Sequence, residues 1–232
     1  MYAADFRRRA RLTLQGSWAP AILTALIASL LGAELFPLGL QIQLDTTRIQ
    51  QLLLDPTLAP ILQGMIAWSL TLSIIGFFLG GVTRLGYCRF QLNLLDQKPA
   101  QLSDLFSQFR RFGAGFCLNL LTGLFIFLWS LLFFVPGLIA AYRYAMAPYI
   151  LAEDPGCTAS EALARSKEMM RGYKARLFCL DLSFFGWRLL GILTLGISNL
   201  WVNPYATLSV AAFYRWRCQE NPEFAPPAQE TP

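Results

Sequence analysis

The chain has 232 residues, of which 55% are hydrophobic and 14% charged, and its formal net charge is +5 at pH 7. An average soluble domain is about one quarter charged, so 19 basic and 14 acidic residues are too few for a soluble surface of this size. The composition therefore excludes a water-soluble enzyme and indicates a protein that uses the bilayer as solvent.

The chain contains no histidine. This absence excludes a Ser-His-Asp triad, a histidine-ligated zinc or haem site and a histidine proton relay. The five cysteines are widely spaced and form no C-x-x-C pair, so they indicate neither a disulfide framework nor a thiolate metal site. We expect no enzymatic activity, no metal and no cofactor.

Apolar segments long enough to cross a bilayer follow one another along the chain. The segment 116–152 is about 55 Å long as a straight helix, too long for one crossing of a core about 30 Å thick, so we divide it at Pro136-Gly137. The segment 177–213 is divided near Gly196 for the same reason. The predicted fold is an all-α polytopic transmembrane bundle whose six spans form three helical hairpins: 20–40, 59–82, 116–135, 138–152, 177–196 and 199–214.

The placement of basic residues supports this division, since Lys and Arg are retained on the cytoplasmic side of short loops. Six spans with both termini cytoplasmic place 16 of the 19 bases inside. These are Arg7, Arg8, Arg9, Arg11, Arg84, Arg89, Lys98, Arg110, Arg111, Arg165, Lys167, Arg171, Lys174, Arg176, Arg215 and Arg217. The predicted location is the plasma (inner) membrane.

Two alternatives remain at the level of topology. The fourth span is short and interrupted by Arg143 and Pro148, so a re-entrant segment is the other interpretation. The basic N-terminus followed by an apolar run also resembles a signal peptide. Residues 1–218 are interpreted as one membrane domain, and the proline-rich tail 219–232 as a disordered cytoplasmic segment.

A cytoplasmic amphipathic stretch that ends at glycine precedes each pair of spans, and an acid followed by a proline comes after each pair. The stretches are 5–16, 104–113 and 161–172, and the acids are Asp96, Glu153 and Glu220. Three parallel hairpin repeats and chance are both compatible with this pattern. In the last stretch, Thr158 to Glu161 has the form of a capping box, which predicts a helix from Thr158 to Arg171. Its bases would face anionic lipid headgroups.

The second half of the chain resembles a known family. Ordered matches run through residues 84–218: Gly86-Tyr87, Phe90, Asp104-Leu105-Phe106, Leu128-Trp129-Ser130-Leu131-Leu132, Pro136-Gly137, Tyr144-Ala145-Met146-Ala147, Asp154-Pro155, Ser166-Lys167, Met170, Gly172-Tyr173-Lys174, Leu180-Asp181-Leu182-Ser183-Phe184, Gly186-Trp187, Trp201, Pro204-Tyr205 and Phe213-Tyr214. These residues are similar to the bacterial integral-membrane family known as domain of unknown function 975. The resemblance implies a polytopic helical fold in a bacterial plasma membrane, and implies no reaction, ligand or catalytic residue.

Polar residues inside the predicted spans are the candidate site, because ionisable groups in hydrocarbon cost several kcal/mol unless they are paired or hydrated. The set comprises Glu34, Arg143, Asp181, Arg188 and Asn203. Asp181 and Arg188 are seven residues apart and share a helix face. One interpretation is a polar pocket or path between hairpins, and the other is pairing that holds the helices together.

Three functions are compatible with these observations. The first is a non-enzymatic scaffold, assembly factor or lipid-contacting component, since six spans leave no segment large enough for a catalytic domain. The second is a transporter or channel subunit that uses the charged set within the spans. The third is an intramembrane enzyme, for which no second acid and no phosphate loop are present. The expected partners are the lipid bilayer and anionic headgroups. Nucleic acid is not expected, because the bases are spread along the membrane boundary, and a protein partner is not indicated.

Overall fold

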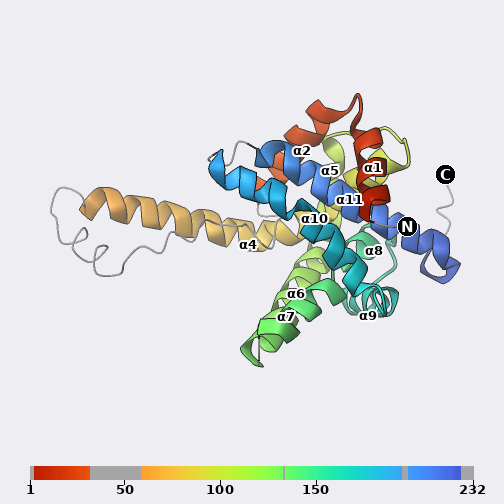
Figure 1. Ribbon diagram of the computed structural model, residues 1–232. Helices are drawn as coiled ribbons and strands as arrows, with labels where there is room; N and C mark the ends of the chain where they lie inside the picture. The colour runs from red at the N-terminus through yellow and green to blue at the C-terminus, as the bar shows by residue number, and fades with distance from the viewer. Residues whose placement is uncertain (1–2, 32–58, 133, 195–197, 226–232) are drawn as a thin grey trace.

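The computed structural model describes residues 3–31, 59–132, 134–194 and 198–225 (Figure 1). Over these ranges the chain consists of helices joined by turns, which confirms the all-α fold class. In chain order the elements are α1 (Ala3–Leu14), α2 (Trp18–Leu30), α4 (Ala59–Leu95), α5 (Ser103–Ser107), the 3₁₀ helix η1 (Gln108–Arg111), α6 (Phe112–Leu132), α7 (Phe134–Arg143), α8 (Ala147–Glu153), α9 (Ala159–Met169), α10 (Lys174–Leu193), α11 (Asn199–Glu220) and the 3₁₀ helix η2 (Pro222–Phe224).

Helix α1 forms a corner with α2, to which it is inclined by 107°. Gly16 makes this corner with φ +89°, a left-handed conformation in which a side chain would be strained. Every fourth residue of α1, namely Phe6, Ala10 and Leu14, is buried. Helix α1 therefore lies across the bundle with one apolar side against α11 and α10, and the predicted amphipathic stretch that ends at Gly16 is confirmed.

Helix α4 is 37 residues long and projects beyond the rest of the described chain (Figure 1). Two glycines allow its inner half to approach its neighbours closely. A Cβ at Gly81 would lie 2.4 Å from the carbonyl oxygen of Gly115 in α6, and one at Gly86 would lie 2.0 Å from that of Leu105 in α5. Gly81 is therefore a point of close packing between α4 and α6. Gly113, by contrast, lies inside α6 and does not end a helix.

The break between α6 and α7 lies earlier than the predicted turn at Pro136-Gly137, which is wrong in position. Pro136 is the third residue of α7, where its missing N–H leaves no intrahelical bond unmade. The predicted fourth span, 138–152, is not one helix. Helix α7 ends at Arg143, and Pro148 lies in the first turn of α8.

Helix α9 begins with the predicted capping box. Thr158 Oγ1 accepts a bond from the Glu161 backbone N–H at 3.4 Å, and a Glu161 carboxylate oxygen accepts one from the Thr158 N–H at 2.9 Å. The bond that the carboxylate accepts from the Thr158 N–H lowers the pKa of Glu161. Gly172 has φ +78°, as expected after a helix end. The apolar side of α9 packs against α8 and α6.

Helix α11 continues to Glu220, and η2 folds back on it, with the Cys218 thiol donating to the Phe224 carbonyl at 3.4 Å. The tail predicted to be disordered from residue 219 is therefore folded up to residue 225, because Asn221 Oδ1 caps η2 through the Glu223 N–H. Residues 226–232 lie outside the described ranges. All five cysteines are free.

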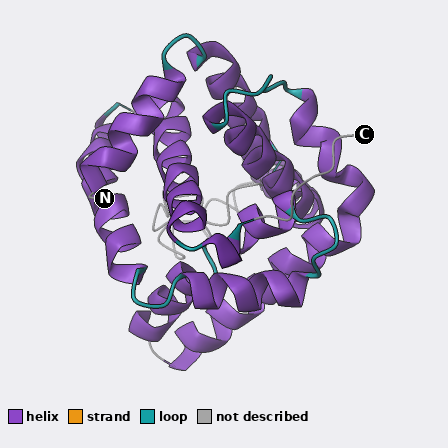
Figure 2. Cartoon of the chain, turned by 90° about the vertical axis from the view of Figure 1, so that its right-hand side faces the viewer, coloured by secondary structure: helices purple, strands orange, loops and turns teal. Residues whose placement is uncertain are grey.

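The longer helices pack into a ring (Figure 2). Helices α4, α6, α7, α10 and α11 each contact the next, and α11 returns to α4. Helix α2 covers α4 and α11, while α8 packs between α4, α6 and α9. Within the described residues, one helical segment, Ser103–Leu131, is by itself long and apolar enough to cross a membrane, and the bent pair α1–α2 would be a second.

Candidate functional site

The polar residues predicted within the spans lie on several elements. Asp181 and Arg188 lie on α10, Arg143 ends α7 and Asn203 lies on α11. Glu34 lies outside the described residues. All four described members are partly buried, which indicates that each has a protein environment on at least one side.

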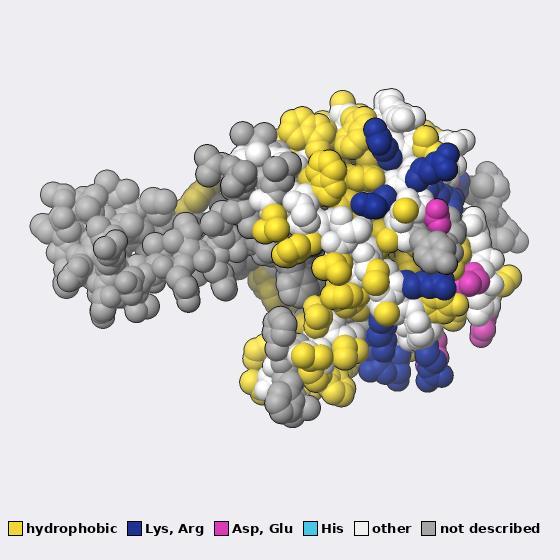
Figure 3. All heavy atoms as spheres, viewed as in Figure 1, with side chains coloured by type: hydrophobic (Ala, Val, Ile, Leu, Met, Phe, Trp, Pro, Cys, Tyr) yellow, Lys and Arg dark blue, Asp and Glu magenta, His cyan; other side chains and the backbone are white. Residues whose placement is uncertain are grey.

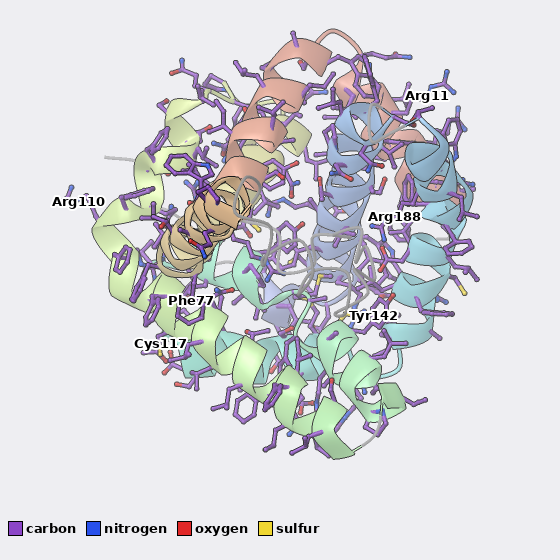
Figure 4. All side chains as sticks on the ribbon, turned by 90° about the vertical axis from the view of Figure 1, so that its left-hand side faces the viewer. Arg11, Phe77, Arg110, Cys117, Tyr142 and Arg188 are labelled. Atoms are coloured by element: carbon purple, nitrogen blue, oxygen red, sulfur yellow. The ribbon has the colours of Figure 1, made fainter. Side chains whose placement is uncertain are left out.

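The structure brings Asp181 and Arg188 together with Tyr142 of α7, a residue that the sequence did not single out. The Tyr142 hydroxyl interacts electrostatically with the Asp181 side chain, and the positive charge of Arg188 acts on both groups. Figure 4 shows Tyr142 and Arg188 on the sides of α7 and α10 that face the middle of the bundle. We call Tyr142, Asp181 and Arg188 the central triad. It joins neighbouring helices of the ring by a polar contact.

Arg143 and Asn203 make different backbone contacts. The carbonyl of Arg143 accepts a hydrogen bond from Ser166 Oγ at 2.9 Å, and Ser166 Oγ in turn accepts one from the Met146 N–H at 3.2 Å. Ser166 of α9 thereby holds the break between α7 and α8. The carbonyl of Asn203 accepts a bond from Thr207 Oγ1 at 2.9 Å, one turn along α11.

The central triad leads to a first prediction. Tyr142→Phe removes the polar interaction with Asp181 and keeps the ring, so we expect a loss of about 0.6 to 1.5 kcal/mol in the free energy of unfolding. In a double-mutant cycle with Asp181→Asn, a coupling energy near zero would contradict the contact. Ser183→Ala on the same helix is the control, since Ser183 bonds only one turn back, to the Leu180 carbonyl.

A second polar cluster lies at the end of the bundle that carries α8 and α9. Arg215 of α11 contacts a carboxylate oxygen of Glu153 at 2.5 Å and one of Asp96 at 2.5 Å. The Tyr214 hydroxyl donates to the other oxygen of Glu153 at 2.9 Å. The side chains of Glu153 and Arg215 are 7% and 14% exposed. We call Asp96, Glu153, Tyr214 and Arg215 the inner network; it ties α8 and the end of α4 to α11.

The acids that follow the three predicted hairpins converge on two arginines of α11. Asp96 and Glu153 pair with Arg215, and Glu220 pairs with Arg217. Arg217 also lies 3.7 Å above the Tyr173 ring and donates from Nε to the Met169 carbonyl at 3.2 Å. The three acids of the repeated acid-proline pattern therefore all form ion pairs with arginines of α11 at this end of the bundle.

Two further arginines hold the segment between α8 and α9. Arg111 donates to the carbonyls of Leu151 and Cys157 at 2.8 and 3.1 Å, which supplies partners for carbonyls near the end of α8. Arg165 pairs with Asp154 at 2.8 Å. These contacts order the connection after Glu153 and so fix the position of that carboxylate.

Electrostatics at the inner network favour the charged form of Arg215. Burial alone opposes its charge, but the nearby carboxylates of Glu153 and Asp96 outweigh that effect and raise the pKa of Arg215. Burial raises the pKa of the neighbouring Cys218 thiol to about 11, so this thiol is protonated at neutral pH. The arrangement is suited to holding helices together and lacks a thiolate nucleophile at Cys218.

Sequence reasoning missed the inner network because it treated these bases as markers of topology. A usable signal was present, since two adjacent acids, Glu153 and Asp154, stand before Pro155, and two bases, Arg215 and Arg217, stand near the end of the last apolar helix. The sequence alone does not show that residues more than 60 positions apart lie close together.

The two best-defined cavities among the described residues are small, each with about 10 Å³ of space, which is room for about one water molecule. One lies between α8, α9 and η2 beside Asp154 and Arg165. The other lies at the crossing of α4 and α6 beside Arg84 and Asn119. Both are of a size that suits a bridging water.

Comparison with known proteins identifies one relationship. Residues 132–220 match the model of the family described as "Protein of unknown function (DUF975)". This match confirms the resemblance over that part of the chain, whereas the resemblance of residues 84–131 stays a prediction. No curated protein and no solved structure matches the chain.

Proposed function

We propose that this protein, whose residues 132–220 carry the DUF975 family pattern, is a multi-pass protein of the bacterial inner membrane that acts without chemistry of its own. In this proposal residues 1–218 form one membrane domain with both termini cytoplasmic. It works as a scaffold, assembly or lipid-contacting component. The six membrane segments are α2 with the residues after it, α4, α6, α7 continued by α8, α10 and α11.

The exposed apolar surface supports membrane embedding. Large apolar side chains point outward from every helix of the ring, an amount that soluble monomers do not expose. They include Leu23, Leu26, Trp68, Phe77, Phe78, Leu124, Phe127, Leu128, Leu131, Val135, Ile139, Leu182, Phe185, Trp187, Leu189 and Trp201. Figure 3 shows that the Lys and Arg side chains gather at the opposite end of the molecule from the projecting α4. This separation fits one inner surface with bases and a lipid-facing apolar belt.

The fourth segment crosses as a broken helix in this proposal. Helix α7 has 10 residues and is about 15 Å long, half the thickness of the hydrocarbon core. A break at this depth is tolerated where protein surrounds it. Residues of α8 are buried throughout, and Ser166 binds both sides of the break.

The scaffold proposal rests on one observation: charged groups inside the bundle pair with other side chains of the bundle. Asp181 lies in the field of Tyr142 and Arg188, and in the inner network the carboxylates of Glu153 and Asp96 both pair with Arg215. Paired groups of this kind hold helices in a fixed arrangement. Such a bundle offers stable outer and inner surfaces to lipids or to a protein partner.

A transporter or channel subunit is the second candidate. The observation in its favour is the position of Tyr142 and Arg188, which are partly exposed and face the middle of the helix ring (Figure 4). Charged groups at such depth often mark a solute or ion path.

One experiment separates these two candidates. The intact protein is purified from native membranes in mild detergent and analysed by native mass spectrometry, and Asp181→Asn is compared with Ser183→Ala in proteoliposomes. We expect stoichiometric lipid or a defined protein partner, together with equal solute flux for both variants. A solute flux that Asp181→Asn abolishes and Ser183→Ala retains would establish the transporter, and purification without lipid or partner would contradict the scaffold.

A further inference from the structure

Helices α4 and α6 pack closely where a glycine of one meets a glycine of the other. A Cβ at Gly81 would lie 2.4 Å from the Gly115 carbonyl oxygen, and a Cβ at Gly115 would lie 3.1 Å from the Cα of Val82. The two backbones therefore lie closer together than larger residues would allow. Both glycines line a small cavity at this crossing, so the cavity is a direct product of the close approach.

Three polar side chains line this cavity, and they come from both helices. They are Arg84 of α4 and Asn119 and Thr122 of α6, while Pro148 of α8 borders the same space. Among the described residues, no acid lines it. The cavity has about 10 Å³ of space, which admits one occupant of about the size of a water molecule. This size excludes phosphate and carboxylate ligands and leaves water or a monatomic ion.

Arg84 lacks the partners that other arginines of the bundle have. Arg89 donates to the Ala152 carbonyl at 3.4 Å, and Arg111 donates to the Leu151 carbonyl at 2.8 Å. Arg84 is partly buried, yet within the described part of the chain no carboxylate pairs with it and no oxygen accepts a hydrogen bond from it. A buried cation is costly unless an opposite charge or water reaches it. The wall of the cavity therefore carries positive charge that the surrounding side chains leave uncompensated.

Thr122 has a hydroxyl that its own helix does not use. Thr13, Thr24 and Thr83 each donate to the carbonyl four residues earlier, at distances of 2.7 to 3.0 Å. Thr122 is 5% exposed and makes no such bond to any described residue, and the Asn119 side chain likewise has no hydrogen-bond partner there. Buried polar groups without a partner are rare in folded proteins. Both side chains therefore have donors available to an occupant of the cavity that they line.

We propose that this cavity binds a chloride ion, held by the Arg84 guanidinium, the Asn119 amide and the Thr122 hydroxyl. All three groups donate N–H or O–H bonds, and the guanidinium adds a fixed positive charge. A water molecule would accept some of these bonds but would leave the charge of Arg84 uncompensated, whereas chloride accepts all of them and offsets that charge. The site depends only on the packing of α4, α6 and α8, and it goes beyond the function proposed above.

The test uses the purified full-length protein in detergent, exchanged into sodium gluconate and titrated with sodium chloride at constant ionic strength. We expect the thermal unfolding midpoint to rise with chloride and then to saturate, because a ligand that binds only the folded state stabilises it. Sodium bromide should act in the same way, while gluconate is too large for the cavity. Crystals grown in bromide should show an anomalous-scattering peak between Arg84, Asn119 and Thr122.

Two variants locate the effect at the cavity. Thr122→Val keeps the shape of the side chain and removes its hydroxyl, so it should weaken chloride binding about tenfold, the effect of one hydrogen bond to a charged group. Arg84→Met removes the positive charge and should abolish the saturable rise of the midpoint.

Thr83→Val is the matched control, since the buried Thr83 hydroxyl already bonds the Leu79 carbonyl at 2.9 Å. This variant should leave the chloride affinity unchanged. Equal losses for Thr83→Val and Thr122→Val would show a general packing effect and overturn the site. A midpoint that does not respond to chloride in the wild-type protein, or that rises without saturation, would also overturn it, as would bromide crystals without a peak at the crossing of α4 and α6.

Discussion

Arg215→Met is expected to lower the free energy of unfolding by about 3 to 5 kcal/mol, because it leaves the buried carboxylate of Glu153 and the nearby carboxylate of Asp96 without their shared cation. The loss is measured by chemical denaturation in detergent, followed by tryptophan fluorescence. Adding Glu153→Gln to Arg215→Met should recover part of the loss, since the buried charge is then removed as well.

Arg171→Met is the control for that prediction. Its ion pair with Glu168 spans 3.6 Å, and the two side chains are 78% and 50% exposed, so its removal should cost less than about 1 kcal/mol. Equal losses for Arg215→Met and Arg171→Met would contradict the role of the inner network as the clamp between α4, α8 and α11.

Gly86→Ala is expected to destabilise the fold by about 3 kcal/mol, because the new Cβ would lie 2.0 Å from the backbone carbonyl oxygen of Leu105. A backbone atom cannot turn away as a flexible side chain can, so α5 must move away from α4. The thermal unfolding midpoint in detergent measures this effect.

Gly123→Ala, in contrast to Gly86→Ala, is not expected to destabilise the fold. No atom lies within 4 Å of a Cβ at Gly123 in the middle of α6, so the alanine should be neutral or should stabilise the helix by up to about 1 kcal/mol. A loss for Gly123→Ala as large as that for Gly86→Ala would show that general helix effects, and not the approach of α5, decide the outcome.

Local signals were enough for several parts of the fold. The capping box at Thr158 and Glu161 predicted the start of α9, and Gly16 and Gly172 predicted helix ends, because these features act between residues a few positions apart. The same local reasoning misplaced the turn at Pro136-Gly137, since proline is also favoured in the first turn of a helix. A local signal that fits two structures cannot choose between them.

The candidate site depended more strongly on tertiary structure. The spacing of Asp181 and Arg188 on one helix predicted that they share a face, and they do act on one another. Tyr142 was not predicted as their partner, because the packing of α7 on α10 brings it there. The same holds for Glu153 and Arg215, which are ordinary boundary charges in the sequence and a buried pair in the structure.

The sequence by itself predicted the all-helical fold that the described residues show and the DUF975 pattern that residues 132–220 match. These properties follow from composition, periodicity and short-range order, which need no long-range contact. Only the tertiary structure decided which of the described charges are paired with one another. Pairing depends on distances between helices, and those distances are set by packing, such as the close approach at Gly81 and Gly86 and the corner at Gly16.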